Sequence, residues 1–195
     1  IFPWYTEGEP ILWWSPDPRL ILEPADLKVS KSLKRVLKKR AFAVTMDRCF
    51  EQVIRKCATV SRRHEQGTWI TPAMITAYCR LHSAGFAHSV EAWADGRLVG
   101  GLYGVSLGRA FFGESMFSEA ADASKTALVY LVRALATWEI NLIDCQVRTE
   151  HLVRMGAREI PRSEFLLRLR EALRHQTRRG QWSLPETIAP EPAAA

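Results

Sequence analysis

A carboxylate stands among aromatic residues and methionine in the segment from Phe111 to Ser118, which reads Phe-Phe-Gly-Glu-Ser-Met-Phe-Ser. The acid of this segment is Glu114. An ionised carboxylate is costly to bury in apolar surroundings, so its pKa shifts or it acquires a hydrogen-bond donor. Glu114 is therefore either a structural hydrogen-bond acceptor or a catalytic group. We expect the end of an active-site strand here.

A second polar cluster interrupts the apolar segment from Leu142 to Val147. Asp144 and Gln146 stand on alternate residues of this predicted strand, and alternate residues of a strand point to the same face. The sequence therefore predicts that an acid and an amide lie side by side. Each of the two could instead be a hydrogen-bonded group of the core.

The pattern of apolar residues predicts an alternation of helices and strands around these two segments. We expect helices at 31–39, 47–60, 71–84, 121–140, 149–155 and 161–175, and strands at 42–45, 88–94, 97–107, 110–114 and 142–147. Ser30 and Thr71 are suitable N-caps, and Pro72 suits a first helical position. The pair Asp95-Gly96 is typical of a hairpin turn.

The chain is basic, with a net charge of +6 over 195 residues. This charge favours a polyanionic partner. Seven of the thirteen residues from Lys28 to Arg40 are basic. On the expected helix, one face would carry four of them, Lys31, Lys34, Arg35 and Lys38. This face is either a solvated surface or a contact to phosphates.

The four cysteines, Cys49, Cys57, Cys79 and Cys145, lie in apolar segments without the spacing of metal ligands. We therefore expect free thiols in a reducing compartment and no metal. No apolar run reaches the ~20 residues that span a bilayer, and no segment resembles a signal peptide. These features predict a cytoplasmic protein that does not bind membranes.

The chain opens on Ile1 rather than methionine, with three tryptophans among prolines in its first fourteen residues. We expect a fragment of a longer protein. A rigid aromatic loop of this kind packs on a core or offers a face for base stacking. The Pro- and Ala-rich end, 185–195, is predicted to be disordered.

Nine segments resemble leucyl/phenylalanyl-tRNA-protein transferases, in the order of that family and over nearly the whole chain. They are 1–4, 12–19, 67–71, 87–91, 100–105, 113–118, 123–128, 142–147 and 156–162. The resemblance implies an α+β, GNAT-like acyltransferase domain at 22–184, preceded at 1–21 by the end of a small N-terminal domain. It implies transfer of Leu or Phe from aminoacyl-tRNA to proteins that begin with Arg or Lys, which marks them for degradation. We expect a monomer without a cofactor.

The resemblance also implies roles for individual residues. Asp144 and Gln146 would face the reacting ester and amine, and Glu114 would hold the arrangement or polarise Gln146. Trp4 and Trp69 would stack on the terminal adenosine of the tRNA. The pocket for the Leu or Phe side chain would consist of Leu102, Met116, Leu131 and Ile143. The chain departs from the family after Val147: the family usually continues with Asn near the position of Thr149, so a role of that Asn is not carried over.

Two other classes of protein fit parts of the pattern. An acyl-CoA N-acyltransferase would share the fold, but it should have a Gly-rich turn before the helix that begins near 121, and residues 117–125 contain no Gly. A non-catalytic RNA-binding protein would explain the basic helix and the tryptophans but not the polar pair Asp144 and Gln146.

Overall fold

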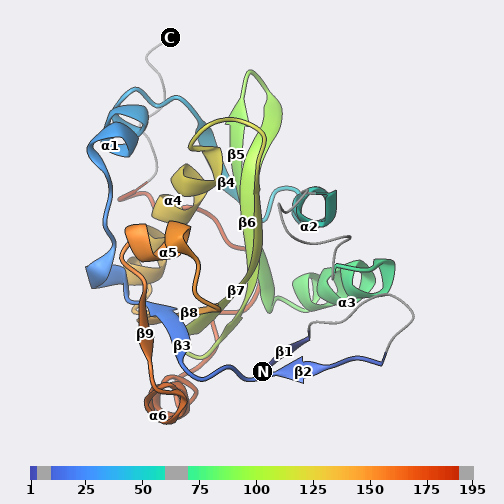
Figure 1. Ribbon diagram of the computed structural model, residues 1–195. Helices are drawn as coiled ribbons and strands as arrows, with labels where there is room; N and C mark the ends of the chain where they lie inside the picture. The colour runs from blue at the N-terminus through green and yellow to red at the C-terminus, as the bar shows by residue number, and fades with distance from the viewer. Residues whose placement is uncertain (4–9, 60–69, 189–195) are drawn as a thin grey trace.

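The computed structural model describes residues 1–3, 10–59 and 70–188, which form a mixed α+β fold around one large sheet (Figure 1). The strands of this sheet, in spatial order, are β4 (Ala43–Met46), β5 (Ala87–Ala94), β6 (Arg97–Leu107), β7 (Ala110–Ser118), β8 (Leu142–Gln146), β3 (Arg19–Leu22) and β9 (Arg158–Ile160). All neighbours among these described strands are antiparallel except β7 and β8. A small sheet pairs β1 (Phe2–Pro3) with β2 (Trp13–Trp14).

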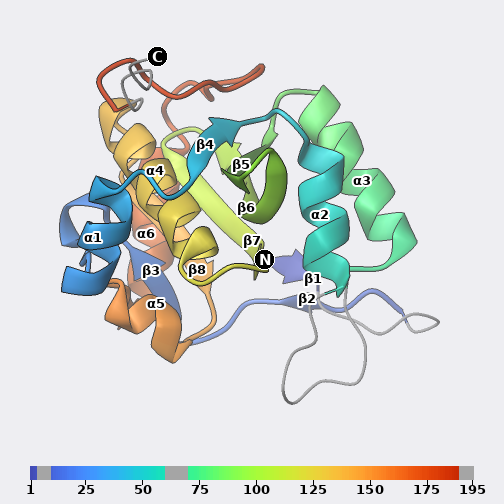
Figure 2. The same cartoon turned by 90° about the horizontal axis from the view of Figure 1, so that it is seen from above.

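Helices cover both faces of the large sheet. They are α1 (Lys31–Lys38), α2 (Phe50–Thr59), α3 (Pro72–Ser83), α4 (Ala123–Thr137), α5 (Glu150–Arg154) and α6 (Arg162–Ala172), with a short 3-10 helix at Pro24–Asp26. Helices α1 and α4 lie on one side, and α2 and α3 lie on the other (Figure 2).

Local signals explain several boundaries. The Ser30 hydroxyl accepts a hydrogen bond from the backbone N of Leu33 and begins α1. Thr71 caps α3 in the same way, through the backbone N of Met74. Asp95 and Gly96 both have positive φ, 49° and 72°, as a two-residue hairpin turn requires. The predicted caps and the predicted turn are confirmed.

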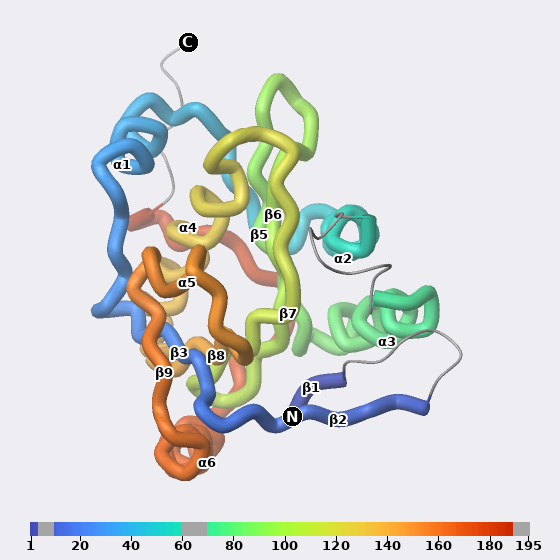
Figure 3. Tube along the Cα trace, in the orientation of Figure 1, coloured from blue at the N-terminus to red at the C-terminus, as the bar shows by residue number. Residues whose placement is uncertain are grey.

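Other expectations differ from the structure. Strand β7 continues to Ser118 because its pairing with β6 extends to Gly100, so Glu114 lies inside the strand and not at its end. Strands β3 and β9 were not predicted, since four and three residues carry too little pattern. Figure 3 shows these two strands beside β8, although they lie far apart in the chain. The domain boundary expected after residue 21 stays a prediction; this position lies within β3.

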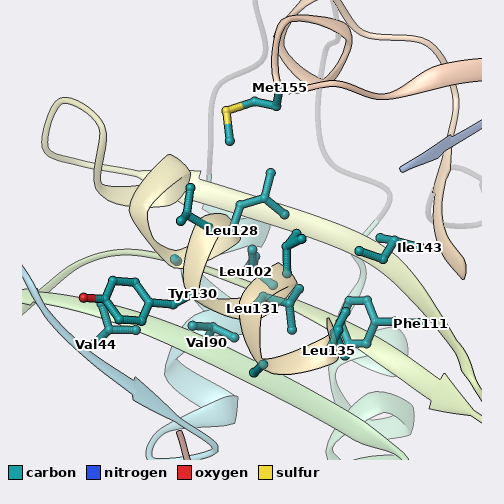
Figure 4. Packing of buried hydrophobic residues seen from close by; sticks show 14 of the residues in the cluster. Val44, Val90, Leu102, Phe111, Leu128, Tyr130, Leu131, Leu135, Ile143 and Met155 are labelled. Atoms are coloured by element: carbon teal, nitrogen blue, oxygen red, sulfur yellow. The ribbon is translucent and has the colours of Figure 1, made fainter. Parts of the chain in front are cut away.

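The main core lies between the sheet and α4, where Leu102, Leu131 and Ile143 are close together (Figure 4). The segment after α6 returns to this core, and Trp182 stacks on His88 with ring centroids 3.6 Å apart. Ile188 also packs against it, so the described start of the tail that was expected to be disordered, 185–188, is ordered. Residues 189–195 lie outside the described residues.

Some findings concern only the described ranges. Within them, no helix is long and apolar enough to cross a membrane. Within the same ranges, no group of three or more His, Cys, Asp or Glu could hold a metal ion. The four cysteines are free; Cys57 is buried and the other three are partly exposed.

Candidate active site

The parallel pairing of β7 and β8 is short, and a cavity opens where it stops. The two strands pair from Ala110 with Leu142 to Phe112 with Asp144. The following residues of each strand line a cavity of about 470 Å³, together with residues of β6, α4 and α5. Phe2 and Pro3 of β1 form part of its wall. The gap between two diverging parallel strands therefore provides the site.

The walls of the cavity are mainly apolar. The structure brings together all four residues that the sequence assigned to a side-chain pocket, Leu102, Met116, Leu131 and Ile143. Phe111 and Leu128 extend the same surface (Figure 4). A wall of this composition suits an aliphatic or aromatic side chain, and Met116 adapts to either shape.

Glu114 enters the cavity from a bulge. Tyr103 pairs with Ser115 and Gly104 pairs with Gly113, so Glu114 is an extra residue of β7 without a partner in β6. The backbones approach so closely that a Cβ at Gly104 would lie 2.2 Å from the carbonyl oxygen of Phe112. The bulge is therefore built into the strand pair and sets the direction of the Glu114 side chain.

Two hydrogen bonds hold the Glu114 carboxylate. The hydroxyl of Tyr78 on α3 donates one, and Nε2 of Gln146 donates the other at 3.4 Å. Burial raises the pKa of Glu114 to about 7, although these two hydrogen bonds favour the ionised form. Both protonation states are therefore populated near neutral pH.

Gln146 has an unusual backbone conformation. Its φ is +63°, which is uncommon for a residue other than glycine. Leu20 pairs with Gln146 while Ile21 pairs with Asp144, so Cys145 is an extra residue of β8. This irregularity interrupts the alternation of side chains. The face that the sequence predicted for both Asp144 and Gln146 is therefore not a simple face of one strand.

Asp144 differs from the expectation that it faces the reacting groups. Its side chain is 0% exposed, and the described residues that line the cavity do not include it. Nε of Arg19 donates to its Oδ1 at 2.9 Å, and Nη2 donates to Oδ2 at 2.6 Å. Its Oδ1 also accepts a hydrogen bond from the backbone N of Gln146 at 2.9 Å.

Arg19 and Tyr78, which contact Asp144 and Glu114, were not predicted as members of the site. Arg19 stands beside the apolar run Leu20 to Leu22, which is the same kind of signal that identified Glu114. Tyr78 gave no signal, because a tyrosine on an amphipathic helix is an ordinary core residue.

Several other groups line the cavity. Burial, and to a smaller extent Asp144, raises the pKa of the Cys145 thiol to about 12, so it stays protonated. Burial, then Lys125 and Arg154, lowers the pKa of His151. The Thr149 hydroxyl accepts a hydrogen bond from the backbone N of Leu152 and begins α5. These groups do not form an activated nucleophile.

His88 lies away from this cavity. Its Nδ1 lies 2.8 Å from Oδ2 of Asp47, and its ring stacks on Trp182 in the core. Trp4 and Trp69, assigned to the terminal adenosine, lie outside the described residues.

The four cations assigned to phosphates form one exposed surface of α1, which we call the α1 basic face. Its members are Lys31, Lys34, Arg35 and Lys38. Leu33 is buried on the opposite side of the helix. Within the described part of the chain, no member has an acidic partner at ion-pair distance, whereas Arg168 and Arg174 near α6 pair with glutamates.

Comparisons with known proteins agree on one family. Residues 21–170 match the family described as leucyl/phenylalanyl-tRNA protein transferase, and residues 1–17 match its N-terminal domain. The leucyl/phenylalanyl-tRNA-protein transferase of Anaeromyxobacter sp. (strain Fw109-5) is 63% identical over 94% of this chain and 78% of its own length. The enzyme of Syntrophobacter fumaroxidans is 64% identical over 88% of this chain and 73% of its own length. That of Desulfatibacillum aliphaticivorans is 59% identical over 94% of this chain and 79% of its own length. The chain belongs to the leucyl/phenylalanyl-tRNA protein transferase family.

Proposed function

We propose that this protein transfers leucine or phenylalanine from aminoacyl-tRNA to the N-terminal Arg or Lys of acceptor proteins. The observation that carries the proposal is an apolar cavity with a carboxylate and an amide at its polar side, Glu114 and Gln146. An aminoacyl side chain occupies the apolar part, and its ester then lies beside the polar pair. The family membership supplies the donor and the protein substrate, and the resemblance of the motifs supplies the acceptor residues.

The chemistry needs no covalent intermediate. The aminoacyl ester is already activated, so the α-amine of the acceptor attacks its carbonyl carbon directly. A C–N bond forms, the C–O bond to the ribose breaks, and a proton passes in net terms from the amine to the ribose oxygen. The α-amine of the acceptor has a pKa of ~7.7–8.0. A group that orients this amine and accepts a hydrogen bond from it is therefore sufficient for the transfer step.

Gln146 is placed to orient the amine. Its Nε2 donates to Glu114, so the Oε1 end of the amide points away from that carboxylate. Oε1 then accepts a hydrogen bond from the attacking amine, and the charge of Glu114 polarises the amide. Asp144 is fully buried and accepts hydrogen bonds from Arg19 and from the backbone of Gln146, so its part in this proposal is to hold the backbone of Gln146.

The order of elements supports a GNAT-like fold for this domain. Strands β5 to β7 form an antiparallel meander with β4 paired antiparallel to β5, then α4 follows, and β8 returns parallel to β7. We propose that the domain has the GNAT arrangement with a different donor, because residues 117–125 lack the glycines that would cradle a pyrophosphate.

A transfer assay tests the function directly. The protein is incubated with Leu-tRNA or Phe-tRNA and with peptides that begin with Arg, Lys or Ala, and the extended peptide is measured by mass. We expect extension of the Arg and Lys peptides only. Acetyl-CoA as donor serves as the comparison for an N-acyltransferase. Two results contradict the proposal: acetylation of the peptide by acetyl-CoA without transfer of an amino acid, and tRNA binding without transfer.

Enlarging one wall residue should change the choice between the two amino acids. Met116→Phe fills part of the cavity, so it should lower kcat/KM for Phe-tRNA about tenfold more than for Leu-tRNA. Met116→Leu nearly conserves volume and should leave the ratio unchanged. The ratio of kcat/KM for the two donors is measured for each variant. An equal loss for both donors in a folded Met116→Phe protein would exclude Met116 from the pocket.

The pKa of Glu114, about 7, predicts the pH dependence of transfer. If the ionised form orients Gln146, the rate at pH 6 should be about tenfold below its plateau because of this group alone. Among the described residues, the titratable and charged groups that act on Glu114 include Tyr78 from α3, Asp144 from β8, Arg19 from β3 and the N-terminal amine of Ile1. The acceptor amine adds a second rise at higher pH. Glu114→Gln should remove the rise near pH 7 and keep the other, and an unchanged profile would exclude Glu114.

The raised pKa of Glu114 also makes the stability of the folded protein depend on pH. Its effect on stability is opposite in sign to its effect on the transfer rate. Between the ordinary pKa of 4.5 and about 7, the folded protein keeps a proton on Glu114 that the unfolded chain releases. The contribution of Glu114 to stability therefore falls as pH rises through this range. Urea unfolding of the wild type and of Glu114→Gln at pH 5 and pH 8 measures it without reference to activity.

A further inference from the structure

We infer that Arg19 is a positioning residue for transfer, which fixes the backbone of Gln146 through the carboxylate of Asp144. The inference rests on the proposed function for its kinetic consequence. It goes beyond that function because Arg19 does not line the apolar pocket and acts on Gln146 only through Asp144. The two ends of the connection are 127 residues apart in the chain and meet only in the folded sheet.

The connection consists of three hydrogen bonds. Arg19 donates to both oxygens of Asp144, at 2.9 Å from Nε and at 2.6 Å from Nη2. The planar guanidinium therefore fixes the carboxylate in two directions. The oxygen that accepts from Nε, Oδ1, also accepts the backbone N–H of Gln146 at 2.9 Å. Turning the carboxylate would break the hydrogen bond to Gln146.

Arg19 is itself held firmly. Its side chain is 2% exposed and lies between two aromatic rings, with the guanidinium carbon 5.2 Å from the centroid of Phe2 and 4.9 Å from that of Phe165. Phe2 belongs to the wall of the cavity and Phe165 to α6. The backbone of Arg19 pairs with Ile160 of β9. The cation is thus fixed by three separate segments before it contacts Asp144.

The geometry of Gln146 explains why such support is needed. A φ of +63° is unfavourable for a residue with a Cβ, and it persists where the surroundings determine it. In this conformation the side-chain amide reaches Glu114 in the cavity. The hydrogen bond to Asp144 stabilises the conformation from the backbone side. Without Arg19, the buried carboxylate would lose both guanidinium hydrogen bonds and would be free to turn towards another donor.

A buried ion pair is by itself weak evidence for a role in stability, because apolar residues of similar volume often replace it without loss. The third hydrogen bond distinguishes this pair from an ordinary one. A purely structural pair would affect the folded fraction, whereas a positioning pair affects turnover of the folded protein and the local protection of Gln146.

The test compares Arg19→Lys with a control, Arg168→Lys. Arg168 also contacts two carboxylates, those of Glu23 and Glu164, but lies at α6 outside the cavity. Lysine keeps the charge but cannot bind both carboxylate oxygens with a planar fork. We expect Arg19→Lys to lower kcat for Leu-tRNA about tenfold or more, with KM changed about twofold or less. Arg168→Lys should leave both unchanged.

Hydrogen exchange provides a readout that does not depend on activity. In Arg19→Lys the backbone amide of Gln146 should exchange about tenfold faster, while that of Ile143 in the same strand should not change. Arg19→Ala with added methylguanidine should recover kcat, and methylamine should not restore it. If Arg19→Ala fails to fold, the Lys variant decides.

The outcomes separate the positioning role from the proposed function. Wild-type kcat and unchanged exchange at Gln146 in a folded Arg19→Lys protein overturn the positioning role. Faster exchange at Gln146 without any transfer by the wild type supports the positioning role and rejects the proposed function.

Discussion

Replacing Gln146 with alanine is expected to slow transfer by about ten- to a thousandfold, while the affinity for aminoacyl-tRNA changes little. In the mechanism proposed above, the Gln146 amide, which donates to Glu114 at 3.4 Å, contacts the amine mainly as it attacks. An interaction made chiefly in the transition state lowers turnover more than binding. Single-turnover rates and equilibrium binding of Phe-tRNA measure the two effects separately.

A matched control is Gln52→Ala, since Gln52 lies exposed on α2 and does not line the cavity. Its rate should equal that of the wild type. Gln146→Ala must also keep its thermal transition, because the backbone at this position has a positive φ. Unchanged turnover in a folded Gln146→Ala protein would remove this residue from the mechanism.

The second large effect concerns the α1 basic face. Replacing its four cations with glutamine, which keeps the helix propensity of α1, should weaken the binding of every aminoacyl-tRNA about equally. Binding to phosphates releases counterions, so the slope of log affinity against log salt should flatten by up to ~0.7–0.9 for each phosphate that the variant no longer neutralises. The support is that these cations are exposed and have no acidic partner among the described residues. Binding is measured at several salt concentrations.

Two comparisons make this experiment specific. The first is a variant with the same reduction of charge at four scattered exposed positions, Arg55, Arg80, Arg97 and Arg170. Its slope should change much less, because net charge alone acts weakly and at long range. The second is an aminoacyl-adenosine donor, which lacks the acceptor stem and should react equally with the wild type and the α1 variant. A merely solvated face predicts the wild-type slope for full-length tRNA.

Much of the architecture followed from local patterns in the sequence. Two kinds of feature could be predicted because each depends only on residues that are close in the sequence. They are the N-caps Ser30 and Thr71 and the hairpin turn Asp95-Gly96. The apolar stripe of α1 was predictable from its period for the same reason. The family resemblance, and not the periodicity, selected Leu102, Met116, Leu131 and Ile143, which the fold then placed around one cavity.

Only the tertiary structure decided how the polar groups are directed. The alternation of a strand predicted a shared face for Asp144 and Gln146, but the irregularity at Cys145 interrupts that alternation. A bulge depends on how two strands pair, and neither strand specifies it alone. Glu114 is likewise an extra residue opposite β6, inside a strand that the sequence ended too early.

The sequence by itself determined the family, most of the helices and strands, and the candidate residues of the site. The fold decided which of those residues meet. Asp144 lies against Arg19, 125 residues away, because β3 inserts between β8 and β9, and a four-residue strand has too little pattern to predict that position. The fold also gives the two carboxyls different surroundings: Asp144 forms an ion pair with the guanidinium of Arg19, while burial raises the pKa of Glu114 to about 7.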